Sequence, residues 1–286
     1  MEAAAQVRKY PAEERSLSTS TTSSSIASTP GKQVDQALLN QKVESKLKAQ
    51  LKENGTICVG LLDSQNIPPP EAARIASLVE KCGAKAVLIG GSTAIDQLEL
   101  DAVVRSVKTS VTSPVILFPG NVTGVSPSAD AIFFSCLMNS DNPYFITEAQ
   151  ALGALAIKKY DLEAIPMAYV IVGDGGAAGF IGRARGIPPN KPSLAAMYAL
   201  AAQYFGMRFL YLEAGSGADG RVSEKMIAAV RKVYDGTLII GGGVKSSQDA
   251  RAAALAGADI IVIGTMLETH DFEATLSDIC SAVSHK

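Results

Sequence analysis

Short apolar runs that alternate with longer segments of helical spacing predict an α/β fold, and their number and order predict a (β/α)8 TIM barrel. Most of the runs are apolar throughout, which is typical of parallel strands that are buried on both faces. The expected strands cover residues 56–62, 86–89, 115–118, 131–136, 165–172, 209–213, 237–240 and 260–263. An open doubly wound sheet is the structural alternative.

Helices are expected between most of these strands, over residues 71–82, 98–110, 145–160, 193–205, 223–233, 247–256 and 272–284. The link between the third and fourth strands is short and contains Pro119, Gly120, Gly124 and Pro127. We therefore expect a loop there in place of a helix. Before the first strand, apolar residues over 34–51 recur at helical spacing and predict one further helix.

The residues that precede this pattern differ in composition. The stretch from about Ser16 to Pro30 consists almost entirely of Ser, Thr, Ala and Pro. Such a segment cannot bury enough apolar surface to offset the entropy lost on ordering. We expect a disordered Ser/Thr-rich tail over residues 1–32 and a single barrel domain over residues 33–286.

Composition excludes several classes of function. The formal net charge is −2, so there is no basic excess to bind a nucleic-acid backbone. No apolar run approaches the roughly 20 residues that cross a bilayer, although contact with a membrane surface stays open. Four widely spaced cysteines without a CxxC pair argue against zinc and indicate a reducing, cytoplasmic location. The two histidines, His270 and His285, lie near the C-terminus, which excludes Ser-His-Asp hydrolysis.

Glycine-rich segments follow the seventh and eighth expected strands. Gly241, Gly242 and Gly243 follow the seventh, and Gly264 with Thr265 follows the eighth. In this barrel the loops after strands seven and eight commonly bind phosphate, because glycine lets backbone N–H groups approach an anion and a helix N-terminus adds positive charge. One such loop is equally well explained as a tight turn, but two neighbouring loops favour a phosphate site.

Carboxylates stand at the ends of two other expected strands. Glu213 ends the sixth strand, where it can hold hydroxyl groups or accept a proton, and a helix cap or a salt bridge is the alternative. Asp63 follows the first strand and Ser92 follows the second. These oxygen ligands on adjacent strands suit Mg²⁺, whereas a turn-forming Asp and a helix-capping Ser are the simpler interpretation.

Several segments, in order along the chain, resemble geranylgeranylglyceryl phosphate synthases. They are residues 114–120, 129–134, 139–144, 182–184 with 191–192, 211–218, 241–244 and 264–265. The resemblance runs from about Val34 to Glu268, and residues 139–144 are similar to the larger archaeal and Bacteroidetes-type branch. It implies a Mg²⁺-dependent prenyltransferase that moves a geranylgeranyl or other polyprenyl group from its diphosphate to the sn-3 hydroxyl of sn-glycerol 1-phosphate. This is the first ether-bond step of archaeal-type membrane lipid biosynthesis.

The resemblance also implies roles for individual residues. Asp63 and Ser92 match the metal site, and Glu213 is the residue that orients the glycerol and takes its proton. The sn-glycerol 1-phosphate site is implied to comprise Tyr211, Leu212, Glu213, Ala214, Gly215, Ser216, Gly217, Gly241, Gly242, Gly243, Gly264 and Thr265. Aromatic candidates for an apolar trench around the prenyl chain are Phe133, Phe134, Tyr144, Tyr169 and Phe180, and ordinary core packing is the more common role of such residues. The family further suggests a dimer or larger homo-oligomer, and lipid substrates suggest peripheral contact with a membrane.

Three positions depart from the family pattern. Cys58 stands where the family usually has His, and Asp63-Ser-Gln-Asn66 replaces Asp-Pro-Asp-Lys. Asp174 lies in a Val-Gly-Asp-Gly-Gly segment where the family tends to have Glu-Pro-Gly-Gly. Two alternatives remain beside the prenyltransferase. One is a homologue that binds glycerol phosphate or a prenyl lipid without turnover, and the other is a sugar-phosphate isomerase or lyase on the same barrel.

Overall fold

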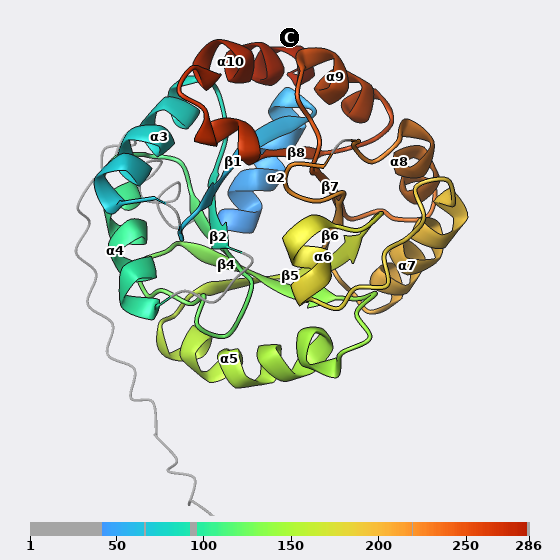
Figure 1. Cartoon of the computed structure of the whole chain (residues 1–286), viewed down its shortest axis with the longest axis horizontal. Coiled ribbons are helices and arrows are strands. Elements are labelled where there is room, and N and C mark those ends of the chain that lie inside the picture. Colours follow the sequence, from blue (N-terminus) through green and yellow to red (C-terminus); the bar gives the residue numbers. More distant parts are fainter. Residues whose placement is uncertain (1–41, 66, 92–95, 219, 285–286) are drawn as a thin grey trace, which may run out of the picture. The chain divides into compact units, whose positions relative to one another are not determined.

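Eight parallel strands form a closed barrel in the order of the sequence, as the computed structural model shows in a view along the barrel (Figure 1). The structure describes residues 42–65, 67–91, 96–218 and 220–284. The predicted tail over residues 1–32 and the domain boundary that follows it lie outside the described residues. The strands are β1 (Ile57–Asp63), β2 (Val87–Gly91), β3 (Val115–Pro119), β4 (Ala131–Leu137), β5 (Glu163–Ile171), β6 (Phe209–Glu213), β7 (Thr237–Gly241) and β8 (Ile260–Ile263). The predicted TIM barrel is confirmed, and the open doubly wound sheet is excluded.

Helices surround the barrel and lie close to their predicted positions. They are α3 (Pro69–Lys81), α4 (Gln97–Lys108), α5 (Ala149–Lys159), α7 (Pro192–Tyr204), α8 (Glu224–Arg231), α9 (Ser247–Leu255) and α10 (Phe272–Val283). A π-helical turn, η1 (Tyr144–Glu148), precedes α5. Two short helices were not predicted, α6 (Gly176–Ile181) and the 3-10 helix η2 (Thr265–Glu268). Within the described residues, no helix is long and apolar enough to cross a membrane.

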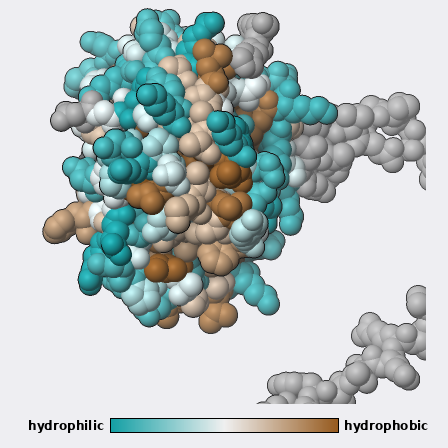
Figure 2. Space-filling model, turned by 90° about the vertical axis from the view of Figure 1, so that its right-hand side faces the viewer, coloured by the Kyte–Doolittle hydropathy of each residue, from teal (hydrophilic) through white to brown (hydrophobic). Residues whose placement is uncertain are grey.

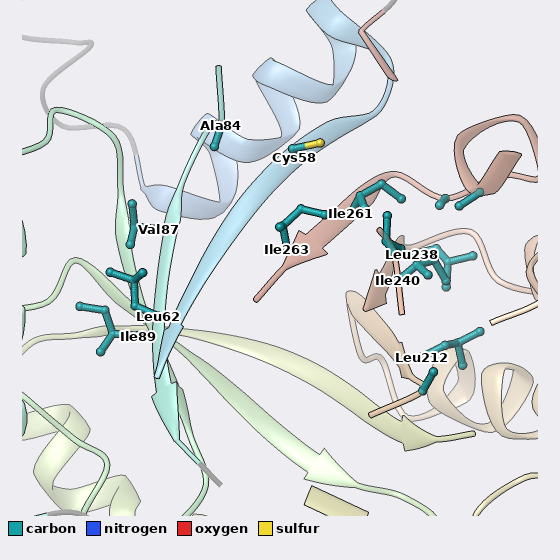
Figure 3. Close-up of a cluster of buried hydrophobic side chains, with 14 of the residues drawn as sticks. Cys58, Leu62, Ala84, Val87, Ile89, Leu212, Leu238, Ile240, Ile261 and Ile263 are labelled. Atoms are coloured by element: carbon teal, nitrogen blue, oxygen red, sulfur yellow. The ribbon is translucent and has the colours of Figure 1, made fainter. Parts of the chain in front are cut away.

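Side chains alternate along each strand between the barrel interior and the layer beneath the helices, as the two-residue period of a strand requires. The interior cluster includes Ile57, Val59, Leu88, Ile116, Phe133, Met167, Phe209, Tyr211, Ile239 and Val262. The outer layer includes Cys58, Leu62, Val87, Ile89, Leu212, Leu238, Ile240, Ile261 and Ile263, which Figure 3 shows at the strands. This alternation decides which residues of a strand can face a site in the barrel mouth.

The helix α2 (Val43–Asn54) closes the N-terminal end of the barrel. Val43 and Leu47 are buried in the interior cluster beside the first residues of the strands. Glu163, the first residue of β5, accepts hydrogen bonds from the backbone N–H groups of Val43 and Glu44. A carboxylate at this position interacts favourably with the positive end of the helix. A site can therefore lie at the opposite end of the barrel, where the strands have their C-terminal ends.

No helix lies between β3 and β4, and residues 120–130 form turns instead. The predicted loop is therefore confirmed. A full helix would fill the layer outside these two strands. The loop and the neighbouring α5 leave space there, and this space becomes part of the site.

Candidate active site

Two pockets open at the C-terminal ends of the strands, and they share a wall. We call the first the glycine pocket; it is lined by Tyr211, Glu213, Ser216, Gly217, Gly242, Gly243, Val244, Lys245, Gly264, Thr265, Met266 and Thr269, with Leu61 and Val262. We call the second the trench; it begins at the barrel mouth and continues between β4, the loop after β3, and α5. Glu213, Ser216, Gly264 and Thr265 line both pockets. The two pockets thus meet at these residues.

Glycine is required at the base of the glycine pocket. Gly242 and Gly243 have φ angles of 78° and 69°, a region that residues with a Cβ rarely adopt. A Cβ on Gly242 would lie 2.5 Å from Oε1 of Glu213 and 2.7 Å from the backbone nitrogen of Gly215. Without side chains at these two positions, the backbone N–H groups can come close to a ligand. Lys245, at the rim, adds the positive charge that an anion needs.

Hydrogen bonds join the loops after β6 and β8 across this pocket. The hydroxyl groups of Ser216 and Thr265 lie 2.9 Å apart. The backbone N–H of Gly217 donates to the Thr265 hydroxyl at 3.1 Å. The two loops that bear the small residues are thereby held at a fixed distance, as recognition of a small anion requires.

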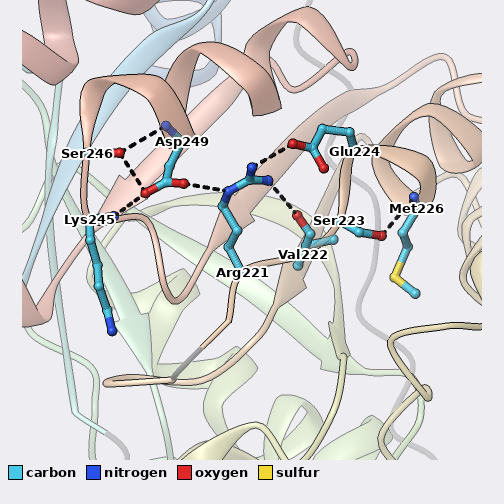
Figure 4. A network of polar contacts seen from close by, with 8 residues as sticks. All are labelled: Arg221, Val222, Ser223, Glu224, Met226, Lys245, Ser246 and Asp249. Atoms are coloured by element: carbon cyan, nitrogen blue, oxygen red, sulfur yellow. Dashed lines mark hydrogen bonds and ion pairs between the residues drawn. The ribbon is translucent and has the colours of Figure 1, made fainter.

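A second network fixes the loop after β7 (Figure 4). Arg221 donates from Nε to Oδ1 of Asp249 at 3.0 Å and from a terminal nitrogen to Glu224 at 2.6 Å. The other oxygen of Asp249 accepts from the Ser246 hydroxyl at 2.8 Å and from the Lys245 backbone N–H at 3.3 Å. Burial raises the pKa of Asp249, but the hydrogen bonds from Arg221 and Ser246 outweigh it and lower the pKa. The first turn of α9 is thus tied to the segment after β6.

Glu213 is a buried carboxylate at the junction of the two pockets. Burial raises the pKa of Glu213, and hydrogen bonds from the Gly215 backbone N–H, 2.6 Å away, and from Tyr211 oppose that shift only in part. A carboxylate with a raised pKa binds a proton more strongly than an exposed one. The group is therefore suited to accept a proton from a bound hydroxyl group.

Aromatic rings form the floor beneath Glu213. Phe118 stacks on Tyr211 with 5.4 Å between ring centroids, and Tyr169 meets Tyr211 edge-on at 5.3 Å. Burial, and then the nearby Glu213, raise the pKa of Tyr211 well above its usual value. Gly241 packs on this ring, because a Cβ there would lie 1.9 Å from the Tyr211 hydroxyl. Tyr211 consequently stays neutral and can donate a hydrogen bond.

The trench has mainly apolar walls. The outer face and end of β4 contribute Ile132, Phe134 and Leu137, and the loop after β3 contributes Val122 and Val125. The roof consists of Phe145, Ala149, Gln150, Gly153 and Ile157, and Ala178, Ile181 and Gly182 of the α6 segment complete the wall. Gln150 donates from its side-chain nitrogen to the Ser135 backbone carbonyl at 2.6 Å, which holds α5 over β4.

The predicted substrate residues divide by strand face. Tyr211 and Glu213 point to the barrel interior, whereas Leu212 and Ala214 belong to the outer layer under the helices and line neither pocket. Gly215 and Gly217 provide φ angles of 113° and 70°. Ser216, Gly217, Gly242, Gly243, Gly264 and Thr265 lie together at the glycine pocket.

Only some of the predicted aromatic residues line the trench. Phe133, Phe134 and Tyr169 line it. Tyr144 instead donates its hydroxyl to Asn121 at 2.6 Å, and Phe180 is 86% exposed. The roof residues on α5 and the rim residue Lys245 were not anticipated. A glycine in the middle of a predicted helix, Gly153, is the sequence signal that could have indicated the roof.

The predicted metal ligands can be placed only in part. Asp63 lies at the trench mouth and accepts a hydrogen bond from the Gln65 backbone N–H at 3.1 Å. Ser92 lies outside the described residues. Among residues with a described position, no cluster of three His, Cys, Asp or Glu side chains could hold a metal ion. One carboxylate still fits Mg²⁺, which binds proteins through one or two carboxylates and takes phosphate oxygens for the rest.

The other two departures from the family pattern lie away from the pockets. Cys58 is on the outer face of β1, in the layer beneath the helices. Asp174 is exposed, accepts a hydrogen bond from the Gly176 backbone N–H at 3.1 Å, and lines neither pocket. All four cysteines are free thiols.

A family model described as the PcrB family matches residues 50–283. The chain belongs to this family. A geranylgeranylglyceryl phosphate synthase of Cenarchaeum symbiosum is 54% identical over 241 residues, which are 84% of this chain and 98% of the relative. A protein of the same name from Thermococcus gammatolerans is 52% identical over 227 residues, 79% of this chain and 90% of the relative. The resemblance predicted from the motifs is confirmed.

Two solved structures share the barrel with this chain. The crystal structure of (S)-3-O-geranylgeranylglyceryl phosphate synthase from Thermoplasma acidophilum, in complex with its substrate sn-glycerol-1-phosphate, matches with a TM-score of 0.82 and 36% identity. The match covers 85% of this chain and 98% of that one. Tryptophan synthase from Mycobacterium tuberculosis, at 12% identity and a TM-score of 0.56, shares the fold alone.

Proposed function

We propose that this protein transfers a geranylgeranyl or similar polyprenyl group from its diphosphate to the sn-3 hydroxyl of sn-glycerol 1-phosphate. The observation that carries the proposal is the meeting of two pockets at one buried carboxylate, one built on glycine backbone with Lys245 at its rim and the other walled by apolar side chains. The glycine pocket suits a small phosphate ester, and the apolar trench suits a long hydrocarbon chain. Relatives that are about half identical bear the name of this activity, which supports the same assignment.

Each part of the site has a task in this reaction. The glycine pocket anchors the phosphate, so that the glycerol hydroxyl lies near the trench mouth, and this fixed alignment lowers the barrier. The hydroxyl oxygen forms a bond to the allylic carbon, and the bond from that carbon to the diphosphate oxygen breaks. The hydroxyl proton passes to the Glu213 carboxylate. Tyr211 and Gly215 hold this carboxylate in place through their hydrogen bonds.

We also propose that Asp63 holds Mg²⁺ together with the diphosphate of the donor. When bound, the ion would neutralise the charge that develops on the departing diphosphate. The position of Asp63 at the trench mouth supports this role. The replacement Asp63→Ala should raise the Mg²⁺ concentration that gives half-maximal rate, and should leave the affinity for glycerol phosphate unchanged. An unchanged Mg²⁺ requirement would remove Asp63 from the metal site.

Extraction of labelled product tests the main proposal. Purified protein is mixed with Mg²⁺, radiolabelled sn-glycerol 1-phosphate and geranyl, farnesyl or geranylgeranyl diphosphate, and label is counted in the organic phase. We expect label with at least one donor, and none with sn-glycerol 3-phosphate at the same concentration. No label with any donor, while glycerol phosphate still binds by calorimetry, would favour the alternative of a binding protein. Turnover of a sugar phosphate without a donor would favour an isomerase or lyase, which has no use for the trench.

We further propose that the protein is a homo-oligomer that associates through the outer face of α7. Residues 192–207 contain no charged side chain, and Leu194, Met197, Tyr204 and Phe205 are exposed. Figure 2 shows apolar residues forming a band across this side of the barrel. A helix that is apolar on its outer as well as its inner face is normally buried. A second copy related by two-fold symmetry would cover it.

Sedimentation equilibrium tests the α7 interface. The unaltered protein should be a dimer or larger, and Met197→Glu should shift it toward the monomer. The matched control is Leu98→Glu on α4, because Leu98 is also exposed but lies apart from this face. A monomeric starting protein, or an equal effect of both substitutions, would contradict the interface.

A further inference from the structure

Two buried cysteines lie between β1 and α10, away from both pockets. Cys58 is on the outer face of β1 and Cys280 is on the buried face of α10, and both belong to the core cluster beneath the helices. Neither residue lines the glycine pocket or the trench, so the transfer reaction gives them no task. Cys58 is also a position at which the chain departs from the family pattern. The contacts around the two residues indicate a use for them as a pair.

The end of α10 is fixed beside the start of β1, against which the helix packs (Figure 1). Ser284, which follows α10, forms an antiparallel bridge with Gly55, and its hydroxyl donates to the Asn54 side chain at 3.4 Å. Cys280 lies about one helical turn before Ser284, and Cys58 lies shortly after Gly55. Because the two segments run antiparallel at the bridge, these two steps lead in the same direction. The two cysteines are thereby brought side by side.

The turn between α3 and β2 contacts both cysteines. A Cβ built on Gly83 would lie 3.4 Å from the Cβ of Cys280, and the backbone N–H of Lys85 donates to the Cys58 carbonyl at 2.9 Å. Between these two contacts, the Cys58 thiol donates a hydrogen bond to the sulfur of Cys280. Among the described residues, no third His, Cys, Asp or Glu completes a metal site with them. The arrangement therefore favours a bond between the two sulfur atoms themselves.

The two thiols differ in reactivity. The hydrogen bond from the Cys58 thiol lowers the pKa of Cys280, and the positive charge of Lys85 adds to this effect against the opposing effect of burial. A thiol with a lowered pKa is more often a thiolate, the form that reacts with oxidants. Cys280 is also 9% exposed, whereas Cys58 is 2% exposed. A small oxidant therefore meets Cys280 first, with Cys58 placed beside it as the second thiol.

We propose that Cys58 and Cys280 form a reversible disulfide when the protein meets a hydroperoxide. The Cys280 thiolate attacks a peroxide oxygen, an S–O bond forms, the O–O bond breaks, and the released hydroxide takes up a proton to become water. The Cys58 thiol then attacks the sulfur of the resulting sulfenic acid. An S–S bond forms, the S–O bond breaks, and the hydroxyl leaves with the thiol proton as a second water. Two thiols are thus oxidised and one peroxide is reduced.

This disulfide would join the first strand of the barrel to its last helix. The loop that it closes contains almost the whole barrel, and a cross-link across a long loop restricts the unfolded chain. The oxidised protein should therefore unfold at a higher temperature than the reduced protein, by about 5 °C or more. Because the pair lies away from both pockets, this inference does not rest on the proposed transfer reaction.

Peptide mapping of the full chain tests the pairing. The folded protein is treated with dilute hydrogen peroxide, free thiols are blocked with N-ethylmaleimide, and the protein is digested with trypsin without reduction. The four cysteines fall in four different tryptic peptides. Mass spectrometry should find the Cys58 and Cys280 peptides joined, two hydrogens lighter than their sum, and separated again by dithiothreitol. A bond from Cys280 to Cys82, or sulfinic acid at Cys280 without any disulfide, would overturn the proposal.

Serine variants and urea provide the controls. Peroxide should raise the unfolding temperature of the unaltered protein and of Cys136→Ser alike, and should raise it in neither Cys58→Ser nor Cys280→Ser. The mapping of the unaltered protein decides the question even if the two buried variants do not fold. The same treatment in urea should give several pairings. If the bond between Cys58 and Cys280 appeared in urea but not in the folded protein, the native arrangement would not select this pair, and the proposal would fail.

Discussion

Glu213 combines three properties that bear on its role. It is buried, it points into the barrel mouth rather than toward the helices, and it belongs to the wall shared by both pockets. Burial raises its pKa, and two hydrogen bonds hold its orientation. These features explain how a site without histidine can accept a proton.

Replacement of Glu213 by glutamine should lower kcat by about 10²–10⁴-fold, the usual contribution of a general base. In the unaltered protein, kcat/KM should fall as the pH decreases through the raised pKa of Glu213, because the protonated form cannot accept the proton. In Glu213→Gln this acidic limb should be absent. The exposed residue Glu71 provides the control Glu71→Gln. A full rate, or an acidic limb that persists in the variant, would exclude Glu213 as the base.

The same pKa predicts how stability depends on pH. A carboxyl group whose pKa is raised on folding stabilises the folded state when protonated. This contribution is complete below the pKa of the unfolded chain and is lost as the pH rises through the folded pKa. Glu213→Gln should therefore gain free energy of unfolding relative to the unaltered protein at neutral pH, and the gain should shrink in acid. Urea denaturation at several pH values measures it, and a gain independent of pH would contradict the raised pKa.

At the scale of elements, the two-residue period of the strands explains what could be predicted of the site. The segment from Tyr211 to Gly217 was correctly placed at the end of a strand, but a contiguous run cannot all face one side. Leu212 and Ala214 turn toward the helices for this reason. The α6 helix was missed because glycine-rich sequence around Gly175 and Gly176 indicates a turn, and packing of this segment against the trench decides its structure.

The loop after β7 depends on a contact between elements. Arg221→Ala removes both hydrogen bonds to Asp249 and Glu224, so the start of α9 loses its tie to the segment after β6. We expect the Kd for glycerol phosphate to rise on the order of tenfold, about 1.4 kcal/mol. The value of kcat at saturating substrate should stay close to that of the unaltered protein, since Arg221 positions the loop and touches no reacting atom. Arg74→Ala, which breaks an exposed pair with Glu71, should change neither value. Unaltered affinity in Arg221→Ala would show that the loop holds its shape without this network.

At the scale of the whole molecule, the order of strands and helices follows from hydrophobic pattern alone, whereas the trench does not. Its roof and floor come from segments far apart in sequence, and its volume arises because the helix between β3 and β4 is absent. Pro119, Gly120 and Gly124 indicated the missing helix. They could not indicate that the resulting space would be closed by α5.

The closed N-terminal end of the barrel should be a source of stability independent of the site. Leu47 of α2 is buried in the interior cluster. Leu47→Ala should lower the free energy of unfolding by about 2–5 kcal/mol, as large-to-small substitutions in cores do. Transfer activity per folded molecule should be unchanged. A loss below about 1 kcal/mol in urea denaturation would mean that α2 is not part of the barrel core.

The central claim is that acceptor and donor meet at Glu213, one in the glycine pocket and the other in the trench. The most direct measurement is a crystal structure with sn-glycerol 1-phosphate and an unreactive thio-analogue of geranylgeranyl diphosphate bound together. We predict phosphate at Gly242, Gly243 and Thr265, a glycerol hydroxyl on Glu213, and the hydrocarbon chain beneath α5. A chain bound outside the trench, or a glycerol hydroxyl beyond the reach of both Glu213 and the allylic carbon, would contradict this account.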